Sequence, residues 1–192
     1  MKKLLFTLFV VLMVGCAFFA CATPPTEEMS RAQDAVFRAE NDPDAVVYAP
    51  SSIIRAREAL VQMQIEADAR RYDSARGFAT EATSHAERAI AEGRAGALRA
   101  REEAANLLGG LQTPMAETSS ALGAARAGDL PLDFNALTGE MDIARRMYNG
   151  AEQSLAAEEF QDAITMGQEV RGILSDINAQ ISDAAQVLAR KQ

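Results

Sequence analysis

The sequence predicts an all-α protein, an elongated antiparallel bundle of helical hairpins with about six helices, two of them long. Its 192 residues are 48% apolar and include 38 alanines, and alanine is the strongest helix former. Twelve glycines and six prolines are too few for the many turns of a sandwich or barrel. Apolar positions recur at intervals of three and four, the helical repeat, along most of the chain. An all-β fold and a disordered chain are therefore excluded.

The N-terminus is predicted to be an export signal covering residues 1–20. Lys2 and Lys3 precede an uncharged apolar stretch, residues 4–22, that ends in small residues, an order typical of secretory signals. A polar, extended tether follows over residues 21–26. A helix of 19 residues would reach about 28 Å, which just spans a hydrocarbon core. An uncleaved anchor and a soluble secreted protein therefore stay open as alternatives.

Both cysteines of the chain, Cys16 and Cys21, lie inside or at the edge of this apolar stretch. A disulfide framework in the folded body is therefore excluded. A lipoprotein signal peptidase requires a small residue directly before the cysteine that receives lipid, and Gly15 and Ala20 both meet this requirement. We predict lipidation at Cys21, with Cys16 as the alternative, because lipidation at Cys16 would leave two phenylalanines in the exposed tether. The lipid would attach the protein to a membrane of the bacterial cell envelope.

The charge balance is acidic, with 19 basic and 27 acidic residues and a net charge of -8. Nucleic-acid backbones reward clustered Lys and Arg, so no nucleic-acid partner is expected. Without the two lysines of the signal, the mature chain has a net charge of about -10. Such a surface resists anionic headgroups, which leaves the acyl chains as the membrane attachment.

The first part of the mature chain, residues 27–108, is predicted to be a helical hairpin region. A first helix is predicted over residues 27–40, and the turn formers at 41–44, including Pro43, end it. A second helix begins at Pro50. From Tyr72 a third, long helix has a seam of small residues that allows neighbouring helix axes to approach closely. The seam consists of Ala75, Ala79, Ala82, Ala86, Ala89, Gly93, Ala97, Ala100 and Ala104.

Gly109-Gly110 and Thr113-Pro114 are predicted to end this long helix. Residues 109–132 then form a linker with a short helix over 115–127. Residues 133–192 form a second helical hairpin, whose last helix, 160–188, has the strongest heptad pattern in the chain. This apolar stripe could mediate homo-oligomerisation, or it could face the preceding helix within one monomer.

Two segments 88 residues apart are similar. Tyr72 and Ala75 in the first correspond to Phe160 and Ala163 in the second. We expect each aromatic residue to fill the corner of a hairpin and each alanine, one turn later, to permit helix contact. The pattern resembles the second helix of a tetratricopeptide motif, although such arrays need three or more copies at a 34-residue period. Internal duplication and a chance match between alanine-rich helices both remain open.

Five short segments carry a family resemblance: residues 21–25, 29–39, 48–50, 56–60 and 72–75. Together they resemble a family of bacterial envelope lipoproteins that contain an alanine-rich domain of unknown function. The resemblance implies a helical, periplasmic domain. Some members of that family continue into an OmpA-like peptidoglycan-binding domain, but nothing after Arg94 resembles one, so peptidoglycan binding is not implied. Ala22 stands where the enteric inner-membrane retention signal has Asp, which favours the outer membrane.

Residues suited to catalysis are sparse. His85 is the only histidine, and Glu81 lies one helical turn before it, so the pair is either a general base with its carboxylate or a helix-surface pair. We favour the surface pair. The adjacent carboxylates 27–28, 102–103 and 158–159 point to different sides of a helix and make poor joint metal ligands. No catalytic residue, metal site or cofactor is predicted.

The sequence thus predicts a non-catalytic lipoprotein, facing the periplasm or the cell surface, that acts as a structural or protein-interaction module. Its expected partners are the membrane, through the N-terminal lipid, and another envelope protein. The alternative is a periplasmic carrier or chaperone that holds a lipid or an unfolded client in a groove between helices.

Overall fold

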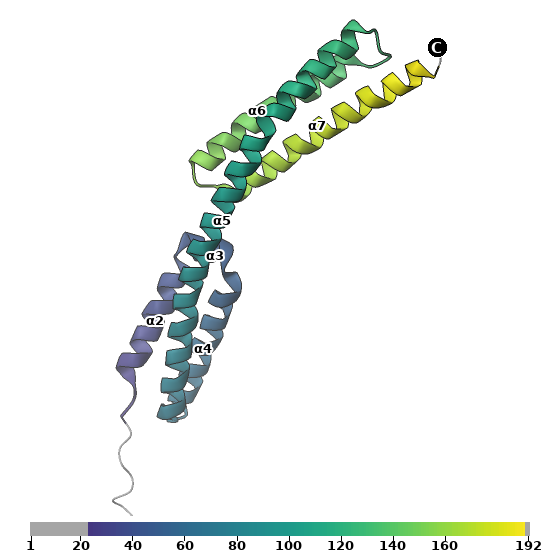
Figure 1. Cartoon of the computed structure of the whole chain (residues 1–192). Helices are drawn as coiled ribbons and strands as arrows, with labels where there is room; N and C mark the ends of the chain where they lie inside the picture. The colour runs from purple at the N-terminus through teal and green to yellow at the C-terminus, as the bar shows by residue number, and fades with distance from the viewer. Residues whose placement is uncertain (1–22, 191–192) are drawn as a thin grey trace, which may run out of the picture. The chain divides into compact units, whose positions relative to one another are not determined.

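The computed structural model describes residues 23–190 and consists of helices joined by short turns (Figure 1). No strand occurs among these residues, so the predicted all-α class is confirmed. None of the helices in this range combines the length and apolar composition that a bilayer crossing requires. The helices are α2 (Thr26–Glu40), α3 (Pro43–Tyr48), α4 (Pro50–Asp68), α5 (Tyr72–Ala127), α6 (Phe134–Ala156) and α7 (Phe160–Ala189).

The chain divides into two compact units, Met1–Gly93 and Arg94–Gln192, here called the N-terminal and C-terminal units. The N-terminal unit packs α2, α4 and the first part of α5 as an up-down-up bundle, with short α3 between α2 and α4 (Figure 1). The C-terminal unit packs the rest of α5 with α6 and α7 in the same order. Antiparallel hairpins are thus present in both units.

The predicted interruption at residues 109–114 is wrong, because α5 continues for 56 residues with Pro114 inside it. A proline within a helix loses one backbone hydrogen bond, a cost that burial of the flanking side chains can offset. Leu108, Leu111 and Thr118, around Pro114, are at most 3% exposed. As a result, residues 94–108 belong to the C-terminal unit and not, as predicted, to the first hairpin region. The predicted linker, 109–132, is mostly the end of α5.

Residues 43–48 form α3, a helix that was not predicted between the one over 27–40 and the one that begins at Pro50. Asp42 caps this helix, since its Oδ1 accepts a hydrogen bond from the Ala45 amide at 2.9 Å. Pro43 occupies the first turn, where its missing N–H carries no cost. Ala45 is fully buried and therefore fixes α3 against the rest of the N-terminal unit.

The core of the N-terminal unit consists mainly of alanine. Gly93 shows how closely its helices approach, because a Cβ at this position would lie 2.5 Å from the Ala45 backbone nitrogen. The largest fully buried side chains are those of Val36 and Met63. The alanines at 0–1% exposure are Ala32, Ala39, Ala45, Ala56, Ala75, Ala79, Ala82, Ala86 and Ala89.

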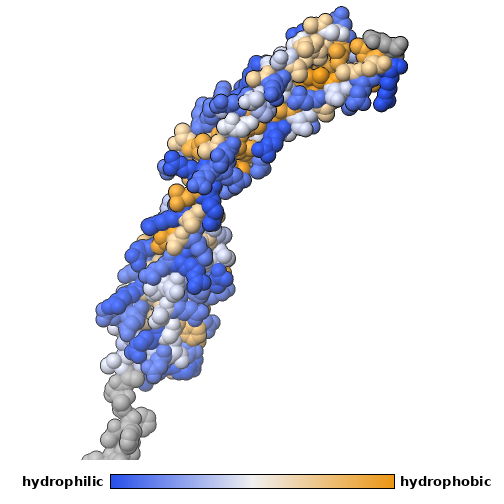
Figure 2. Space-filling model, in the orientation of Figure 1, coloured by the Kyte–Doolittle hydropathy of each residue, from blue (hydrophilic) through white to orange (hydrophobic). Residues whose placement is uncertain are grey.

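The core of the C-terminal unit contains larger side chains. Leu137, Val170, Leu174 and Ile177 are all at most 3% exposed. Gly167 faces side chains here, since a Cβ would lie 2.7 Å from Leu107 Cδ2. In the view of Figure 2, apolar surface gathers on the C-terminal unit, whereas hydrophilic surface dominates the N-terminal unit.

Candidate interaction surfaces

The two hairpin corners place the predicted aromatic and alanine residues in equivalent positions. Tyr72 and Phe160 are the first residues of α5 and α7, and both are half-buried. Ala75 and Ala163, one turn later, are fully buried at 0% exposure. These four residues shape the fold of the two units. The predicted lipidation sites, Cys21 and Cys16, lie outside the described residues.

The backbone also repeats through the two corners. Arg70 and Glu158 both adopt the left-handed conformation, with φ of 59° and 64°. Each corner has the same four backbone hydrogen bonds. The left-handed residue and three of these bonds also occur at the end of α5, at Gly128, Asp129 and Leu130, so the agreement reflects a common way of ending a helix and is not evidence for duplication. The N–H to O pairs are Ala69–Ile65, Arg70–Ala67, Arg71–Glu66 and Ala75–Arg71 in the first corner, and Ala157–Gln153, Glu158–Leu155, Glu159–Ser154 and Ala163–Glu159 in the second.

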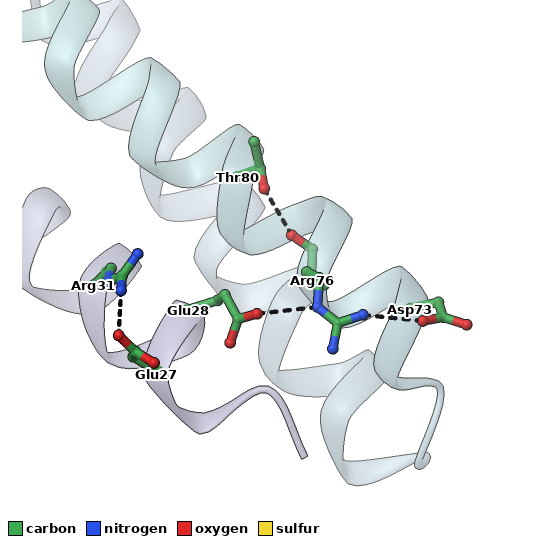
Figure 3. Close-up of polar contacts among 6 residues, drawn as sticks. All are labelled: Glu27, Glu28, Arg31, Asp73, Arg76 and Thr80. Atoms are coloured by element: carbon green, nitrogen blue, oxygen red, sulfur yellow. Dashed lines mark hydrogen bonds and ion pairs between the residues drawn. The ribbon is translucent and has the colours of Figure 1, made fainter. Parts of the chain in front are cut away.

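Ion pairs join the first turns of α2 and α5 (Figure 3). The Arg76 guanidinium lies 3.1 Å from Glu28 of α2 and 3.2 Å from Asp73 of α5, while Arg31 pairs with Glu27 within α2. Hydrogen bonding by the backbone at Glu28, followed by that from Arg76, lowers the pKa of the Glu28 carboxyl. All these side chains are exposed, so the network orients the start of α2 rather than contributing much stability.

His85 and Glu81 lie one helical turn apart on α5, and their side chains do not form a hydrogen bond. His85 Nε2 lies 3.6 Å from Glu81 Oε1, beyond hydrogen-bond distance, and the buried Nδ1 of His85 has no hydrogen-bond partner. The imidazole is 18% exposed and Glu81 is 54% exposed, so the pair lies at the edge between the helix interface and solvent. Within residues 23–190 no group of three or more His, Cys, Asp and Glu side chains could hold a metal ion.

A first apolar surface lies on the outer side of α4. Ile54, Val61 and Ile65 are 53%, 56% and 48% exposed, and their spacing of seven and four places them on one face. We call this surface the α4 stripe. The opposite face of α4 is buried through Ala56 and Met63, both at 0% exposure. Helix α4 is therefore apolar on two sides, of which the bundle uses only one.

A second apolar surface is a furrow between α6 and α7 that contains two hollows, of about 520 Å³ and 450 Å³. Apolar or small residues of both helices form its floor, and charged side chains line its rim. We call this surface the α6–α7 furrow. Its floor contains Ile143, Ile173, Ala179, Met147, Gly150 and Met166. Its rim contains Glu140, Asp176, Asp183, Arg146, Asp162 and Glu169.

A third, more polar hollow of about 300 Å³ lies between α2 and α5 in the N-terminal unit. Thr80 and Thr83 line it, but their hydroxyls donate to the carbonyls of Arg76 and Ala79, at 3.0 and 2.9 Å. These hydroxyl protons are therefore committed to the helix backbone.

Neither apolar surface was predicted from the sequence. The predictions rested on one apolar stripe per helix, whereas α4 and α7 each have a second. The signals were present in the sequence: Ile54 and Val61 recur at seven residues, and so do Met166 and Ile173. In each pair both members lie off the core-facing positions.

Residues 27–106 match a family described as "Domain of unknown function (DUF4398)". The match begins in the first turn of α2, covers the rest of the N-terminal unit and extends into the part of α5 that belongs to the C-terminal unit. The chain is thus similar to this family over its N-terminal unit. Neither a curated protein nor a solved structure matches the chain.

Proposed function

We propose that this protein is a non-catalytic lipoprotein of the bacterial cell envelope that acts as a structural and protein-interaction module. The α4 stripe is the observation that supports interaction most directly. Ile54, Val61 and Ile65 are each about half exposed and lie on one face of α4. Apolar side chains gathered on one exposed helix face are typical of a surface that another protein covers.

Lipid attachment at Cys21, with Cys16 as the alternative, accounts for the leader sequence and keeps the bundle near a membrane. Helix α2 begins at Thr26, five residues after Cys21. Five residues of extended chain reach at most about 17 Å. The N-terminal unit would therefore work close to the membrane surface, with the Ile65 end of the α4 stripe nearer to the start of α2 than the Ile54 end. We favour the outer membrane, because Ala22 replaces the acidic residue of the enteric retention signal.

Metabolic labelling with a palmitate analogue tests the anchor. We expect label in the wild type and in Cys16→Ala and no label in Cys21→Ala, and fractionation should recover the labelled protein with outer membranes. Loss of label in Cys16→Ala alone would move the site to Cys16. Label that survives both substitutions would refute lipidation.

Photocrosslinking in intact cells tests the interaction. A photoreactive residue at Val61 should give an adduct of one reproducible mass, which Ile54→Ser together with Ile65→Ser should abolish. A photoreactive residue at Gln62, exposed on α4 but about 100° around the helix from Val61, is the matched control. Equal adducts at both positions, or an adduct that the serine variants leave unchanged, would argue against the α4 stripe as the contact.

The carrier alternative requires helices that separate around a groove. In the N-terminal unit Ala79, Ala82 and Ala86 are at most 1% exposed, so the seam along α5 is closed. Native mass spectrometry should accordingly detect the protein without a bound lipid. Co-purified lipid in stoichiometric amount would favour the carrier over the interaction module.

A further inference from the structure

The two hollows of the α6–α7 furrow follow one another along a single side of the helix pair. Their α6 residues are spaced by three or four positions, as are most of their α7 residues, so each set shares one helix face. From Asp162 to Asp183 the α7 side extends over 21 residues, or about 32 Å. That length equals a helix of about 20 residues. The spaced residues are Glu140, Ile143, Met147 and Gly150 on α6, and Asp162, Met166, Glu169, Ile173, Asp176, Gln180 and Asp183 on α7.

The floor of the furrow is apolar but remains uncovered. Ile143 is 43% exposed, and Ile173, Met147 and Met166 are half-buried. Val187, 44% exposed, continues the same α7 face two heptads beyond Ile173. Methionine side chains adapt to partners of different shape, which suits a surface that receives another helix.

The rim decides which kind of occupant fits. Five carboxylates and one arginine surround the floor, so the furrow has a net charge of -4. A second copy of this chain docked through the same furrow would bring two such rims together and repel. A cationic partner would instead place Lys or Arg opposite the carboxylates while its apolar side chains cover Ile143 and Ile173.

We propose that the α6–α7 furrow binds a cationic amphipathic helix of about 20 residues from a partner protein. The helix would carry apolar residues at positions i, i+4, i+7 and i+11, flanked by lysine or arginine, in the helix-in-groove mode of recognition. The furrow belongs to the C-terminal unit, so this binding depends neither on the lipid nor on the α4 stripe.

A designed peptide tests the proposal directly. The probe is a fluorescent 20-residue helix with leucine at i, i+4, i+7 and i+11 and lysine on both flanks. Its matched counterpart has glutamate in place of every lysine. With the full chain in neutral detergent micelles, and protein-free micelles as the blank, we expect saturable binding of the lysine peptide that weakens as salt rises. The glutamate peptide should bind at least about tenfold more weakly.

Variants locate the binding. Ile143→Ser with Ile173→Ser should weaken the lysine peptide about tenfold, and Asp176→Asn with Asp183→Asn should weaken it severalfold and flatten its salt dependence. Ile54→Ser with Ile65→Ser, on the α4 stripe, is the matched apolar control and should leave binding unchanged. Circular dichroism confirms that each variant remains helical.

Three outcomes would overturn the proposal. These are no saturable binding of the lysine peptide, equal binding of the glutamate peptide, and binding unaffected by the furrow variants. Sedimentation adds a fourth: a wild-type dimer that Ile143→Ser with Ile173→Ser converts to a monomer would assign the furrow to a second copy. None of these outcomes bears on lipidation or on crosslinking at Val61, so the two proposals fail independently.

Discussion

The N-terminal and C-terminal units share a path of the backbone but fill their cores differently. At an offset of 88 residues, Ala86 of the first unit corresponds to Leu174 of the second, and Ala89 corresponds to Ile177. All four side chains are at most 3% exposed. The N-terminal unit brings helix backbones together, as Gly93 shows, whereas the C-terminal unit fills the space with side chains. The same burial pattern thus supports two modes of packing.

The outer faces of the two units differ as well. Ile143 and Asp176 of the α6–α7 furrow correspond to Arg55 and Arg88 in the N-terminal unit. There, Ser52 donates a hydrogen bond of 2.6 Å to Glu92 and so links α4 to α5. Glu58, Glu81 and Glu92 lie at further equivalent positions, so the charges of this face nearly balance. One scaffold therefore presents a polar face of mixed charge in one unit and an acidic, apolar face in the other.

The largest expected effect comes from exchanging the core residues at one equivalent position. Leu174→Ala should lower the free energy of unfolding of the C-terminal unit by about 3 kcal/mol, because it leaves a cavity among large side chains. Hydrogen exchange read by mass spectrometry, over α7 and separately over residues 75–93, reports each unit.

The reverse exchange, Ala86→Leu, sharpens the same comparison. It should destabilise the N-terminal unit by about 2 kcal/mol through overpacking, since Ala86 is fully buried in a seam of small residues. Exchange over α7 serves as its internal control. If Ala86→Leu is neutral, the alanine seam is loosely packed and the contrast between the units fails.

A second effect distinguishes backbone contact from side-chain contact. Gly93→Ala should lower the free energy of unfolding by about 2 kcal/mol, since the added Cβ would lie 2.5–2.7 Å from backbone atoms of Ala45 and Asp44. Gly167→Ala should cost less than about 1 kcal/mol. Its Cβ meets the Leu107 side chain, which can rotate, and alanine gains about 1 kcal/mol of helix propensity over glycine. Urea unfolding followed by circular dichroism ranks the two variants, and the opposite ranking would contradict the packing difference.

Helix periodicity predicted most of the fold, and it failed where tertiary packing overrode local preference. The end of α2 and the starts of α4 and α6 follow from Pro43, Pro50 and the Asp133 cap, which can be read locally. The ends of α4 and α6 could not be read in this way, because each ends at a left-handed residue that is not glycine, Arg70 or Glu158. Pro114 could not be interpreted in this way, because α5 continues through it only by virtue of the buried side chains on either side. The unit boundary at Gly93 was hidden for the same reason, since the alanine seam runs on unbroken in sequence.

The interaction surfaces were harder to predict than the fold. Ile143 and Ile54 are apolar residues that lie off the repeating core positions, and helix periodicity alone predicts no role for them. Only packing shows that the stripe beside each is already buried, so that these residues are left uncovered. The carboxylates of the furrow come from two helices whose alignment depends on the α6–α7 corner. Their convergence could not be seen in either helix alone.

A third, smaller effect concerns helix caps, which both units use after their first long helix. Asp42 accepts one amide hydrogen bond at the start of α3, and Asp133 accepts two, at 3.0 and 3.1 Å, at the start of α6. Asp42→Ala and Asp133→Ala should each lower the free energy of unfolding by about 1 kcal/mol. Asp42→Asn and Asp133→Asn should restore most of the loss, since asparagine caps as well. Thermal unfolding measures both pairs, and no loss in either alanine variant would remove capping as a determinant of these helix starts.

The smallest effect is a difference in pH dependence between the units. In the N-terminal unit, hydrogen bonds from the backbone and Arg76 lower the pKa of Glu28, and a hydrogen bond from Arg71 lowers the pKa of Glu66. A lowered pKa in the folded state stabilises the fold above the carboxyl's ordinary pKa, and this contribution is lost as pH falls through the folded value. Both carboxyls are exposed, so the acid effect should be small.

The C-terminal unit should respond at the opposite end of the scale. Burial raises the pKa of Tyr148, although a hydrogen bond from Gln112 Nε2 at 3.1 Å acts against this shift. The neutral Tyr148 phenol contributes to the free energy of unfolding below pH 10, and this contribution is lost as pH rises through the pKa of Tyr148 in the folded state. Urea unfolding at pH 3, 7 and 10.5 should therefore show Glu28→Gln reducing the acid dependence and Tyr148→Phe reducing the alkaline dependence. If Glu28→Gln changed the stability at alkaline pH, or Tyr148→Phe changed it at acid pH, the two units would be coupled in stability and could not be treated as separate bundles.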